Sequence, residues 1–262
     1  MNINKLLTAA SLLTLSSLYA DVKISDPEAT YAAAPKIEAS KELQQHIDLG
    51  FANTTGNTET LNLNAKYGMS FITTGYEGRD LKTSFDASAY ITENSGVRDN
   101  EEYKAYLGLE QSFANEWLGY GFVSWLRNTF RNYDSKTLIG AGIGKKLIDD
   151  GTQLLKVKLG GAYNIEEFSD GQPNREFGSV TEYMEYRYKF NAVSEGYVKL
   201  GAMQNVENFS EDYELMAVAG FNFAVAERIT LTLEGEVDYD NLPAVGFKKT
   251  DTKTIARVGY HF

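Results

Sequence analysis

Cysteine is absent from this chain of 262 residues, and histidine and proline are scarce, with two and four copies. Without cysteine there is neither a disulfide framework nor a thiolate metal site. After residue 20, no apolar run is long enough to cross a bilayer as a helix, which takes about 20 residues. Basic residues are also outnumbered, with 25 lysines and arginines against 36 acidic residues, and this excess of negative charge argues against nucleic acid as a partner.

The residues that are present favour strands and turns. Glycine (23), tyrosine (17) and phenylalanine (14) are abundant, and such a mixture with little proline suits sheets better than helices. About 240 residues follow the first twenty, which is enough for a single all-β domain.

The first 20 residues have the layout of a cleaved secretory signal peptide. Lys5 supplies a positive charge, the stretch from Leu6 to Leu18 is short and apolar, and Ala20 is a small residue before the predicted cut. We therefore expect export, with Asp21 as the first mature residue. Removing Lys5 changes the balance from −11 to 24 − 36 = −12. Residues 21–42 lack strand alternation, so we interpret them as a flexible periplasmic leader.

From residue 43 to residue 262 the hydrophobic pattern has a period of two. Ile229, Leu231 and Leu233, for example, alternate with the polar residues Thr230, Thr232 and Glu234. Successive side chains of a strand point to opposite faces, so each segment has one apolar and one polar face. The segments are also long, and membrane strands need roughly 9–11 residues. Twelve such segments follow one another, at 43–54, 58–73, 81–94, 101–114, 117–130, 137–148, 153–168, 178–190, 196–208, 212–226, 229–240 and 253–262.

The connections alternate in length, which indicates a barrel with short periplasmic turns and longer outer loops. Two joints depart from the pattern, since Thr55–Asn57 is short and Thr74–Asp80 is long. The expected outer loops are Asn94–Asn100, Arg131–Lys136, Ser169–Phe177 and Asn241–Thr252. The expected periplasmic turns are Ala114–Glu116, Asp149–Thr152, Asn191–Glu195 and Ala226–Arg228. The fold that we predict is an antiparallel up-and-down transmembrane β-barrel of about 12 strands in the outer membrane of a Gram-negative bacterium.

The last segment ends on an aromatic residue. Val258, Tyr260 and Phe262 share the apolar face of the final strand, and the sequence stops at Phe262. We interpret these three residues as the signal that barrel-assembly machinery recognises. The partners that we expect are therefore this machinery, periplasmic chaperones, and the lipid and lipopolysaccharide of the outer membrane.

Two stretches resemble a known family. The run Gly56-Asn57-Thr58-Glu59-Thr60 resembles the opening motif of the salt-induced outer-membrane proteins, catalogued as domain of unknown function number four-eight-one. The run from Asp240 to Pro243, with Lys248 to Lys253 and the ending Gly259-Tyr260-His261-Phe262, resembles that family's final hairpin. The resemblance covers about residues 43 to 262. It implies an outer-membrane barrel and brings no settled activity or catalytic residues.

The polar face of the strands carries charge of both signs, sorted by strand. If the barrel closes, a basic wall and an acidic wall would face each other across the lumen. Such charges either pair with one another, because an unpaired buried ion is costly, or form a charged constriction. The predicted basic wall consists of Lys156, Lys158, Arg187, Lys189 and Lys199, with Lys145 or Lys146 beside it. The predicted acidic wall consists of Asp48, Glu214, Glu234, Glu236 and Asp238. Four basic residues of the last hairpin are expected to pair with the acidic residues of the neighbouring strand: Lys248, Lys249, Lys253 and Arg257.

Signs of catalysis or metal binding are weak. Hydrolases usually need a histidine, and His46 and His261 both lie at strand ends on the expected periplasmic side. The glycines of 140–144 lack the spacing of a phosphate-binding loop, and we interpret them as a smooth wall against bulky lumen residues. The acidic clusters at 99–102 and 166–170 have no calcium-loop spacing, so we expect solvated charges at the barrel rim.

The function that we predict is non-enzymatic, with no cofactor, catalytic residue or metal. The barrel is expected to be either a narrow channel for small hydrophilic solutes or a plugged barrel of the envelope. Alternatives are a barrel hydrolase that uses His46 or His261, and an adhesive or receptor surface on the outer loops around Tyr133 and Phe247.

Overall fold

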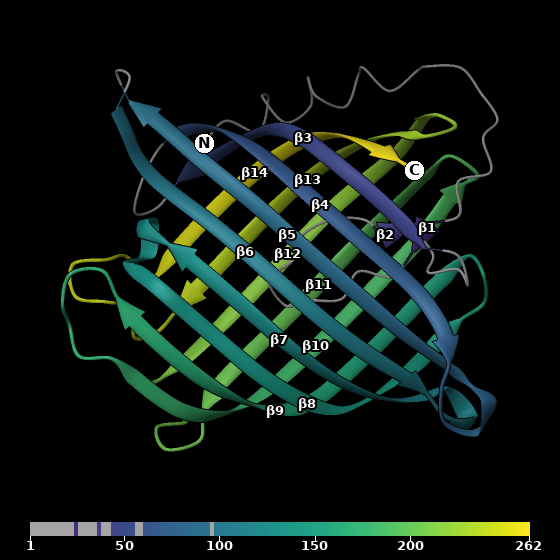
Figure 1. Ribbon diagram of the computed structural model, residues 1–262, viewed down its shortest axis with the longest axis horizontal. Helices are drawn as coiled ribbons and strands as arrows, with labels where there is room; N and C mark the ends of the chain where they lie inside the picture. The colour runs from purple at the N-terminus through teal and green to yellow at the C-terminus, as the bar shows by residue number, and fades with distance from the viewer. Residues whose placement is uncertain (1–23, 26–35, 38–42, 56–59, 95–96) are drawn as a thin grey trace.

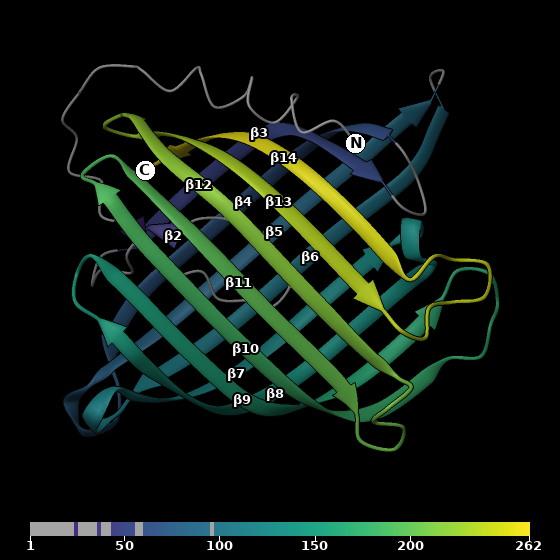
Figure 2. The same ribbon diagram turned by 180° about the vertical axis from the view of Figure 1, so that it is seen from behind.

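A computed structural model of the chain describes residues 24–25, 36–37, 43–55, 60–94 and 97–262. Twelve antiparallel strands, β3 to β14, form one closed barrel, as Figure 1 and Figure 2 show from opposite sides. Each strand pairs with its neighbour in sequence, and β14 pairs with β3 to close the ring. The strands are Gln44–Thr55 (β3), Thr60–Thr74 (β4), Asp80–Asn94 (β5), Val97–Ser112 (β6), Trp117–Asn128 (β7), Tyr133–Asp149 (β8), Gln153–Phe168 (β9), Arg175–Asn191 (β10), Ser194–Asn205 (β11), Tyr213–Ala226 (β12), Ile229–Asp240 (β13) and Thr250–His261 (β14).

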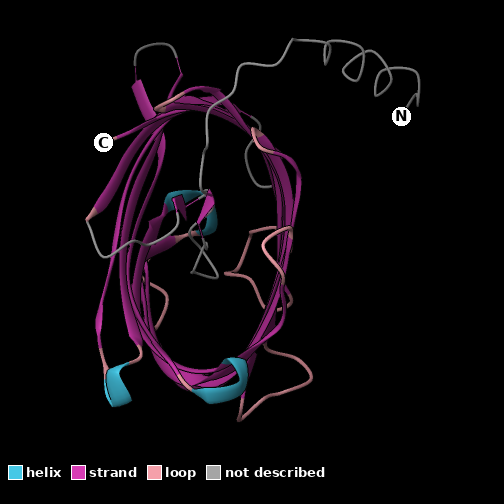
Figure 3. Cartoon of the chain, turned by 90° about the vertical axis from the view of Figure 1, so that its right-hand side faces the viewer, coloured by secondary structure: helices cyan, strands magenta, loops and turns pink. Residues whose placement is uncertain are grey.

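The predicted fold and strand number are confirmed. Closure leaves no open sheet edge, which a hydrocarbon environment would not tolerate. Seen along the barrel, the ring is oval, so that two long walls face each other across a narrow lumen (Figure 3). In the described part of the chain, no helix is long and apolar enough to cross a membrane.

The two ends of the barrel differ. One end carries compact connections, including the short helices Tyr76–Gly78 (η3) and Ala114–Glu116 (η4), and also Phe262; we call it the turn end. Glu77 and Asn115 adopt positive φ in these tight connections. The other end, which we call the loop end, carries Thr129–Arg131 (η5) and the longer loops 169–174, 206–212 and 241–249.

Strand pairing extends further into the loop end than the sequence pattern suggests. β6 begins at Val97, β8 at Tyr133, β10 at Arg175 and β14 at Thr250, so the predicted outer loops were too long. The backbone ladder continues where both faces of a strand are polar. Hydrophobic alternation cannot mark such a strand, because neither face is apolar.

Alternation sorts the side chains between the two faces of the wall. The outer face is apolar and exposed, with residues such as Leu63, Leu159, Leu200 and Phe221. The inner face carries most of the buried side chains, and many of them are charged. The polar residues therefore fill the lumen, and the apolar residues form the surface that would face lipid.

The segment expected to be a leader contributes two strands of two residues each, Ile24–Ser25 (β1) and Lys36–Ile37 (β2). They pair with each other and form a sheet separate from the barrel. The predicted signal peptide and most of the predicted leader lie outside the described residues, so both stay predictions.

Candidate functional site

The polar lumen is the candidate functional site, and the predicted basic wall lies in it. Lys156, Lys158, Arg187 and Lys199 are buried or nearly so, and they face inward from β9, β10 and β11. Lys189 follows in the same alternation near the turn end and is half-buried. Alternation along the strands brings these side chains to one face.

The predicted acidic wall is also buried, and it lies on β3, β12 and β13. Asp48, Glu214, Glu234, Glu236 and Asp238 are all under 9% exposed. Sequence reasoning missed the acidic residues that stand among the basic ones. These are Glu102 and Glu110 on β6, Glu166 on β9, Glu185 on β10 and Glu195 on β11, and each is buried. Along each strand they alternate with outward-facing residues, just as the lysines do. Counting every second residue from a lysine that faces inward would therefore have identified them.

Ion pairs cross the lumen between β6 and the β13–β14 hairpin. The Lys253 ammonium lies 3.1 Å from a Glu102 carboxylate oxygen and 2.8 Å from one of Glu236. Lys104 contacts the same two carboxylates at 3.2 and 3.7 Å. Around the ring, β3, β4 and β5 stand between β14 and β6, so these contacts span the interior rather than follow the wall. We call Lys104, Lys253, Glu102 and Glu236 the crossing cluster.

A second set of bonds lies on the wall that runs from β6 to β11. The Lys158 ammonium lies 2.8 Å from Glu110, which is on β6, and Lys156 lies 3.5 Å from the same carboxylate. Arg187 donates to Glu185 at 2.5 Å and to Glu195 at 2.9 Å. The basic side chains are therefore bound to carboxylates on their own side of the barrel.

The predicted pairing across the last hairpin is present for Lys253 and Arg257, whereas Lys249 donates to Asn241 instead. Arg257 on β14 donates to Glu234 on β13 at 2.8 Å, and Tyr197 on β11 donates to the other oxygen of that carboxylate at 2.5 Å. Lys199 lies with its ammonium 5.1 Å from the centroid of the Tyr197 ring, within range of a cation–π interaction. The acidic and basic walls are thus joined through Glu234.

At the loop end, ion pairs from η5 and β8 reach strands across the lumen. Arg131 of η5 lies 3.1 Å from Asp240 and 3.5 Å from Glu214, on strands across the lumen. Burial by itself lowers the pKa of Arg131, but the surrounding carboxylates, Glu214 first, more than offset this and raise the pKa above its usual range. Lys136 on β8 also bonds Glu214 and lies 2.9 Å from Glu166.

Three expectations about the rim were wrong. Tyr133, expected at the tip of an outer loop, is 2% exposed and stacks on Phe168, so it offers no surface to a partner. Glu102 and Glu166, expected to be solvated rim charges, are each 1% exposed inside the lumen. Both residues occupy inward-facing positions of their strands and contact basic side chains there. They can be buried because a charge is kept away from water only where it is paired.

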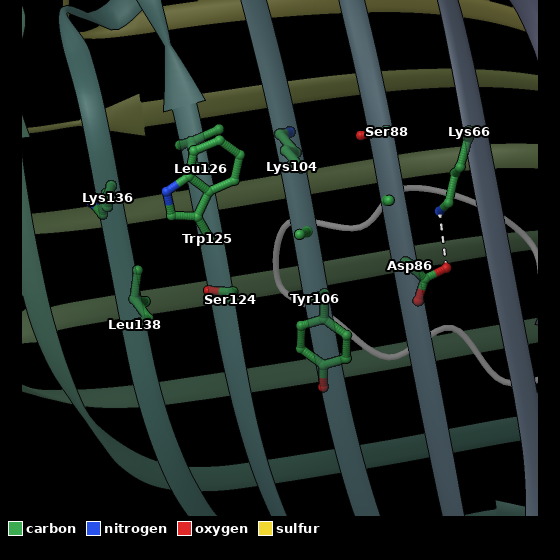
Figure 4. A pocket seen from close by; sticks show the side chains of 12 residues that line it. Lys66, Asp86, Ser88, Lys104, Tyr106, Ser124, Trp125, Leu126, Lys136 and Leu138 are labelled. Atoms are coloured by element: carbon green, nitrogen blue, oxygen red, sulfur yellow. Dashed lines mark ion pairs between the residues drawn. The ribbon is translucent and has the colours of Figure 1, made fainter.

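A small cavity lies against the inner wall of β4 to β8. It has a volume of about 20 Å³, room for a single water molecule, and Lys66, Asp86, Lys104, Tyr106 and Ser124 are among its lining residues. Figure 4 shows these side chains on adjacent strands, with the Lys66–Asp86 ion pair, at 3.6 Å, running along the wall. This pair joins neighbouring strands, unlike the crossing cluster.

Inward glycines make room for large lumen side chains. A Cβ atom on Gly142 or Gly160 would collide with the Tyr120 hydroxyl, and one on Gly140 would collide with the Phe122 ring. The predicted role of the glycines at 140–144, as a smooth wall beside bulky residues, agrees with this geometry.

The two histidines lie close together at the turn end but bond different partners. Their ring centroids are 5.8 Å apart. His46 lies 3.6 Å from Asp48, whereas His261 lies 2.8 Å from the Thr230 hydroxyl. The acid and the hydroxyl therefore contact different rings, an arrangement unlike a hydrolase triad, in which one histidine bonds both. Among the described residues there is no group of three or more His, Asp or Glu side chains that could hold a metal ion.

The three residues of the predicted assembly signal lie on the outer face. Val258, Tyr260 and Phe262 are 46–55% exposed, and the rings of Tyr260 and Phe262 stack with centroids 6.1 Å apart. Their recognition by assembly machinery stays a prediction.

Known structures with this architecture are outer-membrane barrels. The porin NanC is 6% identical, with a TM-score of 0.53 over 82% of this chain and 98% of that chain. An outer membrane channel from Pseudomonas putida F1 is 10% identical, with a TM-score of 0.53 over 91% of this chain and 100% of the other. Outer membrane phospholipase A from Escherichia coli is 12% identical, with a TM-score of 0.50 over 82% and 89%. No curated protein matches the sequence.

The likeness to these outer-membrane proteins establishes the fold, a closed antiparallel β-barrel like theirs, and does not assign an activity. A comparison by sequence gives a more specific relationship than the fold does: a family model matches residues 47–262. This match agrees with the resemblance seen in the two end motifs. Because the match runs from residue 47 to residue 262 and so takes in nearly the whole barrel, this chain belongs to the family described as "Protein of unknown function, DUF481".

Proposed function

We propose that this protein is a non-enzymatic channel, narrow at rest, for small hydrophilic solutes in the bacterial outer membrane. The crossing cluster is the observation that carries the proposal. Buried ion pairs contribute no more stability than well-packed apolar side chains of similar volume. A lumen built from charges instead of leucines is therefore better explained by the passage of polar solutes when the paired charges separate than by stability.

The size of the barrel fits this function. Eight-stranded barrels are filled by side chains and sixteen-stranded barrels hold a wide aqueous channel, so twelve strands lie between. Lys104 and Lys253 reach carboxylates on strands across the lumen, at 3.7 and 3.1 Å, so the passage between the walls is narrow at this level. Passage would then require a solute or its ions to compete for these pairs, which makes conductance sensitive to salt. The likeness to a porin and to an outer membrane channel is one of fold and is compatible with this role.

The test is conductance of the refolded full chain in planar bilayers. We expect small unitary currents from the unaltered protein. The double variant Lys104→Ala with Glu236→Ala keeps the net charge but removes a contact that spans the lumen, so it should raise the conductance several-fold. The matched control, Lys66→Ala with Asp86→Ala, removes a pair that lies along the wall and should change conductance much less. A folded barrel that stays silent in both forms would contradict the channel and favour a plugged barrel.

The basic wall offers a test of selectivity. Replacing Lys156, Lys158, Arg187 and Lys189 with glutamate should move the reversal potential toward cation selectivity, because the lining charge sets which ions enter. An unchanged reversal potential would remove these residues from the solute path.

Export by a cleaved signal peptide and insertion by assembly machinery are part of the same proposal. A hydrolase remains the alternative, and the separate partners of His46 and His261 weigh against it. Assays of lipid and peptide hydrolysis on a barrel without conductance would test it, with His46→Ala and His261→Ala as the informative variants.

A further inference from the structure

Among the residues whose side chains the structure describes, a single charged one stands in the middle of the apolar outer belt. Glu182 lies near the centre of β10 and points outward, and it is exposed. The other outward charges whose side chains the structure describes lie toward the two ends, such as Arg127 and Glu176 at the loop end and Lys145 at the turn end. In the described part of the chain, no hydrogen bond or ion pair engages the Glu182 carboxylate.

The wall around Glu182 is hollowed. A depression of about 720 Å³ lies over β9 to β13, on the wall that faces the viewer in Figure 2. Ala202 stands directly opposite Glu182 on β11, and Leu159 stands opposite it on β9. Ala217 and Leu215 continue the lining on β12. Small residues at this position allow another surface to approach closely, as they do between membrane helices.

Lipid cannot satisfy this carboxyl group. Hydrocarbon chains donate and accept no hydrogen bonds, so an ionisable side chain at this depth needs a protein partner. The described outer belt of this chain contains no cation that a second copy could bring to it. A second copy does bring its own Glu182 to the same depth, and two carboxyl groups held together share a proton.

We propose that the hollow around Glu182 is the contact surface for a second copy of this chain, related by a two-fold axis that passes close to Glu182. A two-fold contact uses the same patch on both subunits, so each Glu182 faces the other. The shared hydrogen bond and the fit of the two hollowed walls then hold the dimer in the membrane.

The first experiment measures dimerisation of the full chain in detergent micelles and in lipid vesicles, by sedimentation and by energy transfer between labelled copies. The unaltered protein should dimerise. Glu182→Leu should weaken the dimer by about tenfold, the size of one hydrogen bond within a membrane. Leucine suits a surface that faces lipid, so this variant should still fold, which a gel-shift assay of the folded barrel checks.

Two controls separate the contact from general effects. Glu176→Leu makes the same change on the same face of β10, close to the loop end, and should leave the dimer unchanged. Glu182→Gln can still donate and accept a hydrogen bond and should retain the dimer. A monomeric unaltered protein at every protein-to-detergent ratio would overturn the proposal, as would a Glu182→Leu variant that dimerises normally or a Glu182→Gln variant that does not.

Cross-linking gives an independent readout, because the chain has no native cysteine. Ala202→Cys, beside Glu182, should form dimers in membranes with a short bismaleimide. Ala65→Cys on β4, outward on the opposite wall, should not. Equal cross-linking at both positions would indicate random encounters and would refute the assigned surface.

Discussion

Lys253→Met tests whether the crossing cluster is a closed, dry layer. The substitution removes an ammonium that contacts Glu102 and Glu236 and lies 3.9 Å from Asp238. Lys253, Glu102 and Glu236 are all under 9% exposed, so the carboxylates lose a partner that water cannot easily replace. Breaking a buried pair by removing one partner costs about 3–5 kcal/mol. A pair in a water-filled lumen would cost about 0–1 kcal/mol, as on a protein surface.

The assay is urea unfolding of the refolded barrel in phospholipid vesicles, followed by the fluorescence of Trp117 and Trp125. Lys248→Met, in an exposed loop, is the control and should change stability by under about 0.5 kcal/mol. Adding Glu102→Gln to Lys253→Met should recover about 0.5–3 kcal/mol, because the removed charge is the one left without its partner. A loss below about 1 kcal/mol for Lys253→Met would refute the closed layer and indicate bulk-like water between the walls.

Two further predictions concern the turn end. The Asp150 carboxylate accepts the backbone N–H groups of Thr152 and Gln153 at 2.9 and 2.7 Å, and these bonds lower its pKa below the usual 3.8. The bonds therefore stabilise the folded state above pH 3.8, and this stabilisation is lost as the pH falls through the lowered pKa. Asp150→Ala should be less stable than the unaltered protein at neutral pH, and the urea unfolding curves of the two proteins should converge in acid. A difference in stability that stays constant with pH would contradict this. Deleting Phe262 should lower the fraction of folded barrel in cells without changing refolding in vesicles, and Phe262→Tyr should assemble normally; equal cellular yields would show that the terminal aromatic is no assembly signal.

The fold could be predicted because its information is local. Alternation along segments such as Tyr213–Ala226 depends on residues two positions apart, and each strand pairs with the next one in sequence. Inward parity also placed Lys156 and Glu234 in the lumen without knowledge of the barrel's cross-section. Strand ends were predicted less well, because Val97 and Tyr133 begin strands where both faces are polar and the periodic signal is absent.

The sequence by itself determined a twelve-stranded barrel with a charged lumen and an apolar belt, because both follow from a period of two along each strand. Only the tertiary structure decided which charges meet. Lys253 and Glu102 are 151 residues apart, and their contact depends on how the closed ring brings the inner faces of β14 and β6 within reach of each other. The isolation of Glu182 is likewise a property of the closed barrel. Its distance from the other described outward charges is set by the stagger of neighbouring strands, which no single segment encodes.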